Sequence, residues 1–256
     1  MNFINKEKSI NATIFKDDKL NENNNSSFIK YSYNELNFFS FQKALKYDKR
    51  KFCQYYLSML KIQNLILFSF YPINDYNIKI IKICLFFLFF DIYFAVNTLF
   101  FNDSTIHQIY IDRGVYNLGY FMPQIIYSFI ISYIISILIK YFCLSERTLL
   151  ELKNEENNDD LNDKGDKLKK RLIIKYIIFF VLSFIFLFLF WYYLSSFCAV
   201  FQNSQVYLIK NTFISFTMAL IYPFLFILLP GFLRFYSLKK KRNECIYKIS
   251  TFMQLL

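Results

Sequence analysis

The chain has 256 residues, of which 55% are hydrophobic and 22% are aromatic, but it contains only 4 glycines and 4 prolines. A soluble domain of this length is rarely so apolar or so poor in turn-forming residues, so the composition argues against a soluble protein. The net charge is +11, yet the basic residues lie between long apolar runs, which points to membrane topology and argues against nucleic acid as a partner.

The five cysteines are scattered along the chain, without a CxxC pair or zinc-ligand spacing. This pattern predicts neither a disulfide framework nor a metal site. We find no Walker motif, nucleophile elbow, HExxH motif or pair of catalytic carboxylates. The sequence therefore predicts no cofactor, and we expect a protein that is not an enzyme.

Residues 1–40 are polar and contain the run "NENNNSS", which is typical of a disordered tail. Residues 41–72 follow with apolar positions at helical spacing, which predicts a basic amphipathic juxtamembrane helix. Its polar side carries Lys43, Lys46, Lys49, Arg50 and Lys51. Such a helix suits an anionic cytoplasmic leaflet, but packing against the protein's own spans is an equal alternative.

Four long apolar runs follow, and each has the length of about 20 residues that a helix needs to cross the bilayer core. They cover residues 83–101, 120–139, 176–196 and 212–233. Because irregular backbone cannot face lipid, these runs predict an all-α, polytopic helical membrane protein in which four transmembrane helices follow an amphipathic interfacial helix.

The distribution of Lys and Arg predicts the orientation of these spans. Residues 1–82, 140–175 and 234–256 hold 13, 9 and 6 basic residues, whereas the two alternating connections hold 1 each. By the positive-inside rule, both termini and the 140–175 loop are cytoplasmic, and 234–256 is a basic cytoplasmic tail. A fifth span over residues 52–71 is the second choice, because it would bury Lys61.

Asp91 lies near the middle of the first span, where a carboxylate costs roughly 2.5–3.5 kcal/mol to insert. No basic side chain lies at a similar depth in the other spans. The second span offers Gln124, Ser128, Ser132 and Ser136 at a spacing of four, which places them on one side of a helix. Asp91 is then either a structural hydrogen-bonding group in a helix interface or a proton or cation site.

Several runs together resemble the C-terminal multi-span membrane region of a family of uncharacterised protist transmembrane proteins. The resemblance covers roughly residues 40–253 and is carried by "ALKYDKRKFCQYYLSMLK", "TLFFNDSTIHQIYIDRGVYN", "PQIIYSFIISYIISILIKYFCLSERTLLELK", "WYYLSSFCAVFQNSQVYLIKNTFISF" and "LLPGFLRFYSLKKKRNECIYKIS". It implies a membrane-embedded unit and brings no catalytic motif. In longer relatives this region follows other sequence, which would suit an anchor or assembly module.

Two functions follow as the main hypotheses, and an intramembrane enzyme acting on lipid ranks third because paired catalytic groups are missing. The first is a non-enzymatic anchor, scaffold or subunit of a membrane assembly, with the bilayer and other membrane subunits as partners. The second is a small ion channel or transporter that uses Asp91 and the polar stripe of the second span. A polar, water-lined cavity that reaches Asp91 would favour the second hypothesis, whereas a dry, tightly packed bundle would favour the first.

Overall fold

We describe a computed structural model of the chain, which covers residues 31–73, 75–146, 149–150, 161–240 and 243–255. The chain separates into two units, Met1–Tyr31 and Ser32–Leu256, and the fold discussed below is that of the second. Most of the tail predicted to be disordered, and the acidic part of the predicted 140–175 loop, lie outside the described residues.

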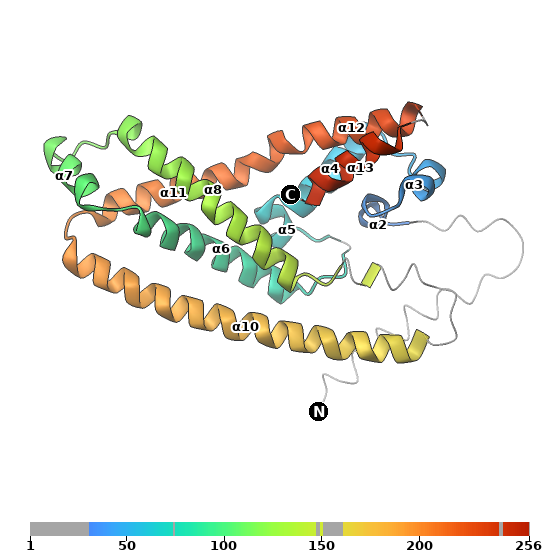
Figure 1. Cartoon of the computed structure of the whole chain (residues 1–256), viewed down its shortest axis with the longest axis horizontal. Helices are drawn as coiled ribbons and strands as arrows, with labels where there is room; N and C mark the ends of the chain where they lie inside the picture. Colours follow the sequence, from blue (N-terminus) through green and yellow to red (C-terminus); the bar gives the residue numbers. More distant parts are fainter. Residues whose placement is uncertain (1–30, 74, 147–148, 151–160, 241–242, 256) are drawn as a thin grey trace, which may run out of the picture. The chain divides into compact units, whose positions relative to one another are not determined.

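All regular secondary structure among the described residues is helical (Figure 1). The helices are α2 (Tyr33–Asn37), α3 (Phe41–Tyr47), α4 (Phe52–Gln63), α5 (Leu65–Phe70), α6 (Lys79–Leu99), α7 (Asp103–Ile111), α8 (Leu118–Cys143), α10 (Leu161–Val200), α11 (Gln205–Phe226), α12 (Leu228–Lys240) and α13 (Glu244–Leu255).

Four helical stretches are long and apolar enough to cross a membrane, so the prediction of a helical protein with four candidate spans is confirmed. They are Lys79–Leu99, Leu118–Cys143, Gly165–Val200 and Gln205–Lys239. The third is far longer than the predicted 176–196 span. Its 36 residues correspond to about 54 Å of helix, whereas a bilayer core is about 30 Å thick. Helix α10 therefore continues into the basic segment that was predicted to be part of a loop.

Helices α6, α8 and α11 pack against one another and form the centre of the bundle. Phe216 of α11 shows how aromatic side chains fill this centre, because its ring makes edge contacts with Phe86, Phe90 and Tyr93 of α6 at centroid distances of 5.8, 5.2 and 5.6 Å. Such pairs add about 0.5–1.5 kcal/mol each beyond the area that they bury. Many of the phenylalanines thus have a packing role in this bundle.

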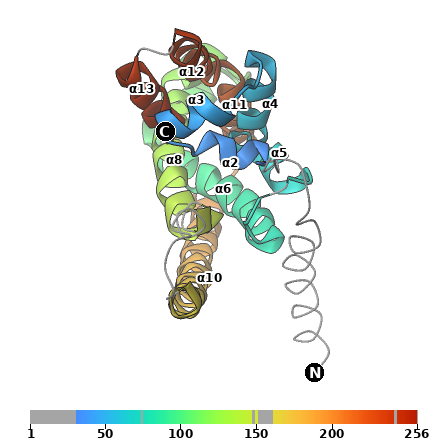
Figure 2. The ribbon, with the colours of Figure 1, turned by 90° about the vertical axis from the view of Figure 1, so that its right-hand side faces the viewer.

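Helix α10 lies at the edge of the bundle and contacts α6 and α8 (Figures 1 and 2). Only 6% of its most apolar window is buried inside the structure, compared with 50% for α6. Phe184 and Phe188 are among its exposed large side chains. A helix that is apolar on most sides and buried on few needs lipid or another protein around it.

The predicted disordered tail needs a correction at its end, because Tyr33–Asn37 form helix α2. Ser32 caps this helix by accepting a hydrogen bond from the Glu35 amide, while the Glu35 carboxylate accepts one from the Ser32 amide. Leu36 and Phe39 are buried. This capping box and two buried apolar side chains give the segment enough favourable contacts to order it.

The single amphipathic helix predicted over residues 41–72 is instead three short helices, α3, α4 and α5. The second break lies at Asn64, whose backbone is extended. Its side-chain oxygen accepts from the Leu67 amide at 3.1 Å, and its Nδ2 donates to the Leu220 carbonyl at 2.8 Å. A fifth span over 52–71 would need about 20 continuous helical residues, but α4 and α5 have 12 and 6.

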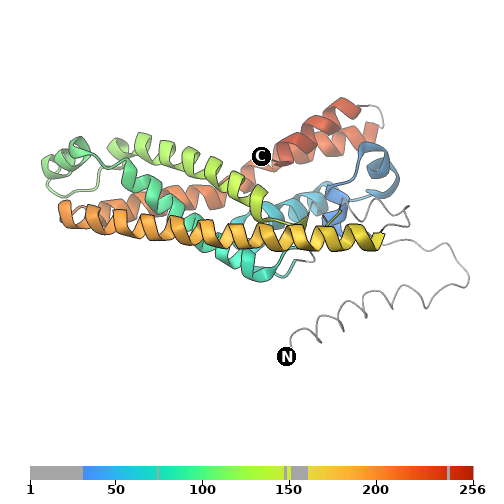
Figure 3. The ribbon, with the colours of Figure 1, turned by 60° about the horizontal axis from the view of Figure 1, so that its bottom comes forward.

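The predicted basic tail of residues 234–256 is also a folded part of the protein. Helices α12 and α13 pack closely on each other and lie at the same end of the bundle as α2, α3 and α4 (Figure 3). Gly231 allows α12 to approach α4, because a Cβ atom there would lie 3.2 Å from ring carbons of both Phe52 and Tyr55. We call this end, built from α2–α4, α12 and α13, the terminal layer.

Candidate functional site

The polar stripe predicted on the second span lies on the buried face of α8. Ser128 and Ser132 are fully buried and Ser136 nearly so. The Ser136 hydroxyl donates to the Ser132 carbonyl at 2.8 Å, one turn earlier in the same helix. No partner is found for the Gln124 amide nitrogen or for the hydroxyls of Ser128 and Ser132 among the described residues. The stripe is thus a place where helices pack closely, with few hydrogen bonds between them.

Asp91 does not join this stripe. The residue is half-buried, and no hydrogen bond connects it with Gln124 or the serines in the described part of the chain. At about 100° per residue, Asp91 lies roughly 160° around α6 from Tyr93, which is buried against Phe216 of α11. The carboxylate and the serine stripe are therefore separate features of the bundle.

A buried contact between α6 and α11 is the cross-helix polar pair that sequence reasoning missed. The Asn97 amide donates to the Ser215 hydroxyl at 2.8 Å and to the Tyr93 carbonyl at 2.8 Å. Both Asn97 and Ser215 are fully buried. An uncharged amide draws less attention than a carboxylate in a sequence, although Asn97 lies in the same predicted span as Asp91. Such cross-helix bonds average about 0.6 kcal/mol in membranes.

The five basic residues predicted for the membrane surface divide into two groups. Lys43, Lys46, Lys49 and Lys51 are exposed on the terminal layer. Arg50 is an exception, because only 4% of its side chain is exposed and it pairs with Asp48. Arg50 therefore belongs to the protein interior, and the spacing of charges alone could not distinguish it from its lysine neighbours.

The strongest concentration of buried charge is a group that we call the ionic cluster, formed by Asp48, Arg50 and Arg234 with the rings of Tyr55 and Tyr247. Arg50 makes a two-point contact with Asp48, with Nε–Oδ1 and Nη2–Oδ2 distances of 2.8 Å each. Arg234 reaches the same carboxylate from α12, with an Nη2–Oδ2 distance of 3.2 Å. One carboxylate thus pairs with two guanidinium groups.

The two arginines also satisfy backbone and side-chain acceptors around them. Arg234 donates to the Leu36 and Asn37 carbonyls at 2.7 and 3.3 Å, and its guanidinium lies 4.7 Å from the Tyr247 ring centroid. Arg50 donates to the Asn37 side chain at 2.9 Å and to the Ser58 hydroxyl at 3.1 Å. These contacts connect α2, α4, α12 and α13 through one buried network.

Burial alone would raise the pKa of Asp48, but the hydrogen bonds and charges of Arg50 and Arg234 outweigh it and hold that pKa below its usual range. The carboxylate is therefore ionised at neutral pH, which keeps the buried charges paired. Burial also raises the pKa of the Tyr55 and Tyr247 phenols, which stay neutral.

A second polar cluster joins the loop before α6 to the residues after α8. Lys82 pairs with Asp75 at 2.7 Å. Asn77 accepts hydrogen bonds from the Ser145 and Glu146 amides at 3.0 and 3.2 Å, and its Nδ2 donates to the Glu146 carboxylate at 3.2 Å. Burial, and then the Asp75 carboxylate, raise the pKa of Glu146 to about 7.

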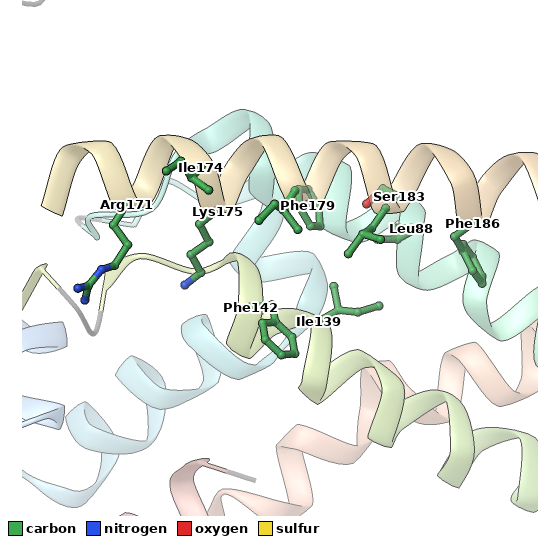
Figure 4. Close-up of a pocket in the computed structure, with 11 residues that line it drawn as sticks. Leu88, Ile139, Phe142, Arg171, Ile174, Lys175, Phe179, Ser183 and Phe186 are labelled. Atoms are coloured by element: carbon green, nitrogen blue, oxygen red, sulfur yellow. The ribbon is translucent and has the colours of Figure 1, made fainter. Parts of the chain in front are cut away.

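A cavity of about 600 Å³ lies between α10 and the facing parts of α6 and α8, and its lining residues are apolar except for Arg171, Lys175 and Ser183 (Figure 4). Asp91 and the serine stripe are not among them. Across the residues that the structure describes, no group of three or more His, Cys, Asp or Glu side chains is placed to hold a metal ion. The five cysteines are free.

Comparisons with protein-family models, with curated proteins and with solved structures found no match to this chain. The resemblance noted over residues 40–253 therefore stays a prediction.

Replacing Asp48 with Asn should destabilise the protein by about 3–5 kcal/mol, because it leaves two buried arginines without a counter-charge. Chemical unfolding of the purified protein in detergent, followed by helical circular dichroism, measures this loss. The matched control is Glu244→Gln, which removes an ion pair to Lys248 on the exposed side of α13 and should change stability little. Equal stability of Asp48→Asn and wild type would contradict the role of the ionic cluster.

Glu146 should make the folded state less stable as the pH rises from about 5 to about 7. Its folded pKa of about 7 lies above the ordinary value of 4.5, so in this range the folded protein holds a proton that the unfolded chain has lost. The shift in pKa corresponds to a decrease in the free energy of unfolding on the order of 3 kcal/mol, and this decrease is complete above about pH 7.

The Glu146→Gln variant should match wild type near pH 5 and be more stable near pH 8, as measured by the unfolding midpoint in a common detergent. Asp48 titrates below this range and does not contribute to the difference. Glu244→Gln is again the control and should keep the wild-type pH profile. An unchanged profile for Glu146→Gln would show that this carboxyl does not titrate as proposed.

Proposed function

We propose that this chain is a non-enzymatic component of a membrane assembly, which acts as an anchor, scaffold or subunit. The observation that carries this proposal is α10, whose apolar window is 6% buried within the chain. Phe184 and Phe188 are 72% and 67% exposed on it. The apolar windows of the other three candidate spans are 50%, 22% and 28% buried, so α10 is the least covered of the four and offers an apolar surface to a neighbouring membrane protein.

The terminal layer supports the same proposal, because it is a folded layer with exposed basic residues next to the spans. Its exposed lysines (Lys43, Lys46, Lys49 and Lys51) stand on a fold held by the ionic cluster. Exposed basic residues beside a membrane favour an anionic leaflet, with about 1 kcal/mol per residue near the surface. We propose that this layer lies against that leaflet.

The orientation that follows has both termini in the cytoplasm, and it is supported by the alternation of 13, 1, 9, 1 and 6 basic residues between the spans. The described helices are compatible with it, because α3 and α13 both belong to the terminal layer, whereas α7 lies at the other end of the bundle (Figure 1).

Labelling with a membrane-impermeant thiol reagent tests this orientation in sealed vesicles whose C-terminal tag is accessible. Cys245 is exposed in α13, and a cysteine at position 167 lies in the basic start of α10. Both should react before the membrane is opened. In a chain whose exposed Cys53 and Cys245 are replaced by serine, a cysteine replacing Val115, which is 70% exposed in the segment between α7 and α8, should react only afterwards. If Val115→Cys reacted before the membrane was opened and Lys167→Cys reacted only afterwards, the proposed orientation would be contradicted.

The scaffold proposal and the transport alternative differ in their expectations for α10 and Asp91. A photo-crosslinking residue at Phe184 should capture a neighbouring membrane protein in the native membrane, whereas the same residue at Phe190, which is buried beside Phe94 of α6, should crosslink within the chain. Crosslinks from Phe184 to lipid alone would count against a subunit role.

Reconstituted vesicles should show no flux of protons or common cations above protein-free vesicles, for wild type and for Asp91→Asn alike. Asn keeps a donor and an acceptor at the same depth, so folding should be unaffected. Flux in wild type that disappears in folded Asp91→Asn would overturn the scaffold proposal in favour of transport.

A further inference from the structure

The apolar cavity beside α10 is open along the helix and has charge at one end only. Its apolar walls come from α10, α6 and α8, and include Phe179, Leu182, Phe186, Leu88, Ile139 and Phe142. Arg171 and Lys175 line its other part. We call this cavity the α10 groove.

Arg171 and Lys175 are four residues apart in α10, so they share one face of the helix. Figure 4 shows both side chains extending from α10 at the same end of the groove. Lys175 is held there because its Nζ donates to the Leu144 carbonyl at 2.8 Å, which leaves two of its three N–H groups for a ligand. No described carboxylate pairs with either residue. The groove therefore has an almost wholly apolar lining, to which Arg171 and Lys175 contribute mainly their carbon atoms, and their charged groups lie at one end of it.

The dimensions of the groove select a chain-like occupant. From Arg171 to Phe186 the helix rises about 22 Å, which is half the thickness of a bilayer including its headgroup regions, about 40–45 Å. The cavity of about 600 Å³ lies along this face of α10. A single hydrocarbon chain is an extended and flexible occupant that fits.

The charged end also lies where a lipid headgroup would be. Lys175 directly precedes the apolar run that begins at Tyr176, and Arg171 lies one helical turn earlier, so both lie at the boundary of the predicted third span. Basic pockets between transmembrane helices at this level suit anionic headgroups. We propose that the α10 groove binds an anionic glycerophospholipid, with its phosphate at Arg171 and Lys175 and an acyl chain along Phe179, Leu182 and Phe186. This site lies on the side of α10 that faces α6 and α8, and it does not depend on the proposed scaffold function.

Native mass spectrometry of the full chain in detergent, with added phosphatidylglycerol or phosphatidylcholine of identical acyl chains, tests this site. Wild type should retain phosphatidylglycerol about 10- to 30-fold better than phosphatidylcholine, because two basic residues attract the net negative headgroup of the first lipid, whereas choline neutralises the phosphate of the second. The double variant Arg171→Gln, Lys175→Gln should bind both lipids equally.

The matched control is the double variant Lys169→Gln, Lys170→Gln, which removes the same charge from exposed positions of α10 next to the groove. It should keep the wild-type preference. If the control lost the preference for phosphatidylglycerol as fully as the groove variant does, the proposed site would be overturned in favour of diffuse attraction between charges. Equal retention of the two lipids by wild type would overturn it as well.

Two further variants keep the test decisive if Lys175→Gln disturbs folding through its bond to Leu144. Arg171→Gln alone, at an exposed position, should lower the preference for phosphatidylglycerol by several-fold. Ser183→Phe places a ring within the groove lining and should reduce retention of both lipids while leaving the helical circular dichroism unchanged. If folded Ser183→Phe retained both lipids as well as wild type does, the acyl chain of the lipid would have to lie outside the groove.

Discussion

The Asp48 carboxylate, shared by Arg50 and Arg234, is the interaction on which the terminal layer depends. It joins residues 186 positions apart in the sequence, and the side chains of all three are at most 4% exposed. Isolated arginines at this depth would be very costly, so each needs the carboxylate, the surrounding carbonyls and the tyrosine rings. The geometry is therefore demanding, and it orders the segments that supply these partners.

This dependence explains why polar segments at both sides of the spans are folded. Helix α2 presents its last carbonyls to Arg234, and Tyr247 of α13 donates to the Phe39 carbonyl at 2.6 Å. Together they close over the guanidinium groups, and the close approach of α12 to α4 at Gly231 brings Arg234 within reach of Asp48.

Within the spans, uncharged polar groups form the cross-helix hydrogen bond and the closely packed stripe, while the single carboxylate lies apart. Asn97 and Ser215 bond across α6 and α11, whereas Asp91 lies on another side of α6. Helix α10 then differs from the others, because one side lines an apolar groove with a basic end and the other sides have no cover. These two sides suit two kinds of neighbour, lipid inside the groove and lipid or protein outside it.

The sequence by itself determined that the chain is helical and that four stretches can span a membrane, because hydrocarbon requires continuous hydrogen-bonded helices of about 20 apolar residues. It also predicted that the serine stripe of α8 shares one side of a helix, since that follows from a spacing of four.

Only the tertiary structure decided which charges are inside. Arg50 and Lys49 are neighbours with the same charge, and nothing local separates the buried residue from the exposed one. Arg50 is buried because it reaches Asn37 and Ser58, and because the Asp48 carboxylate beside it is also held by Arg234. Arg234 comes from a helix far away in the chain, as Ser215 does for Asn97. The break at Asn64 depends likewise on the Leu220 carbonyl of α11. The spans were predictable because they are set by local composition. The burial of single polar and charged side chains was not predictable, because it is set by contacts with residues distant in the sequence.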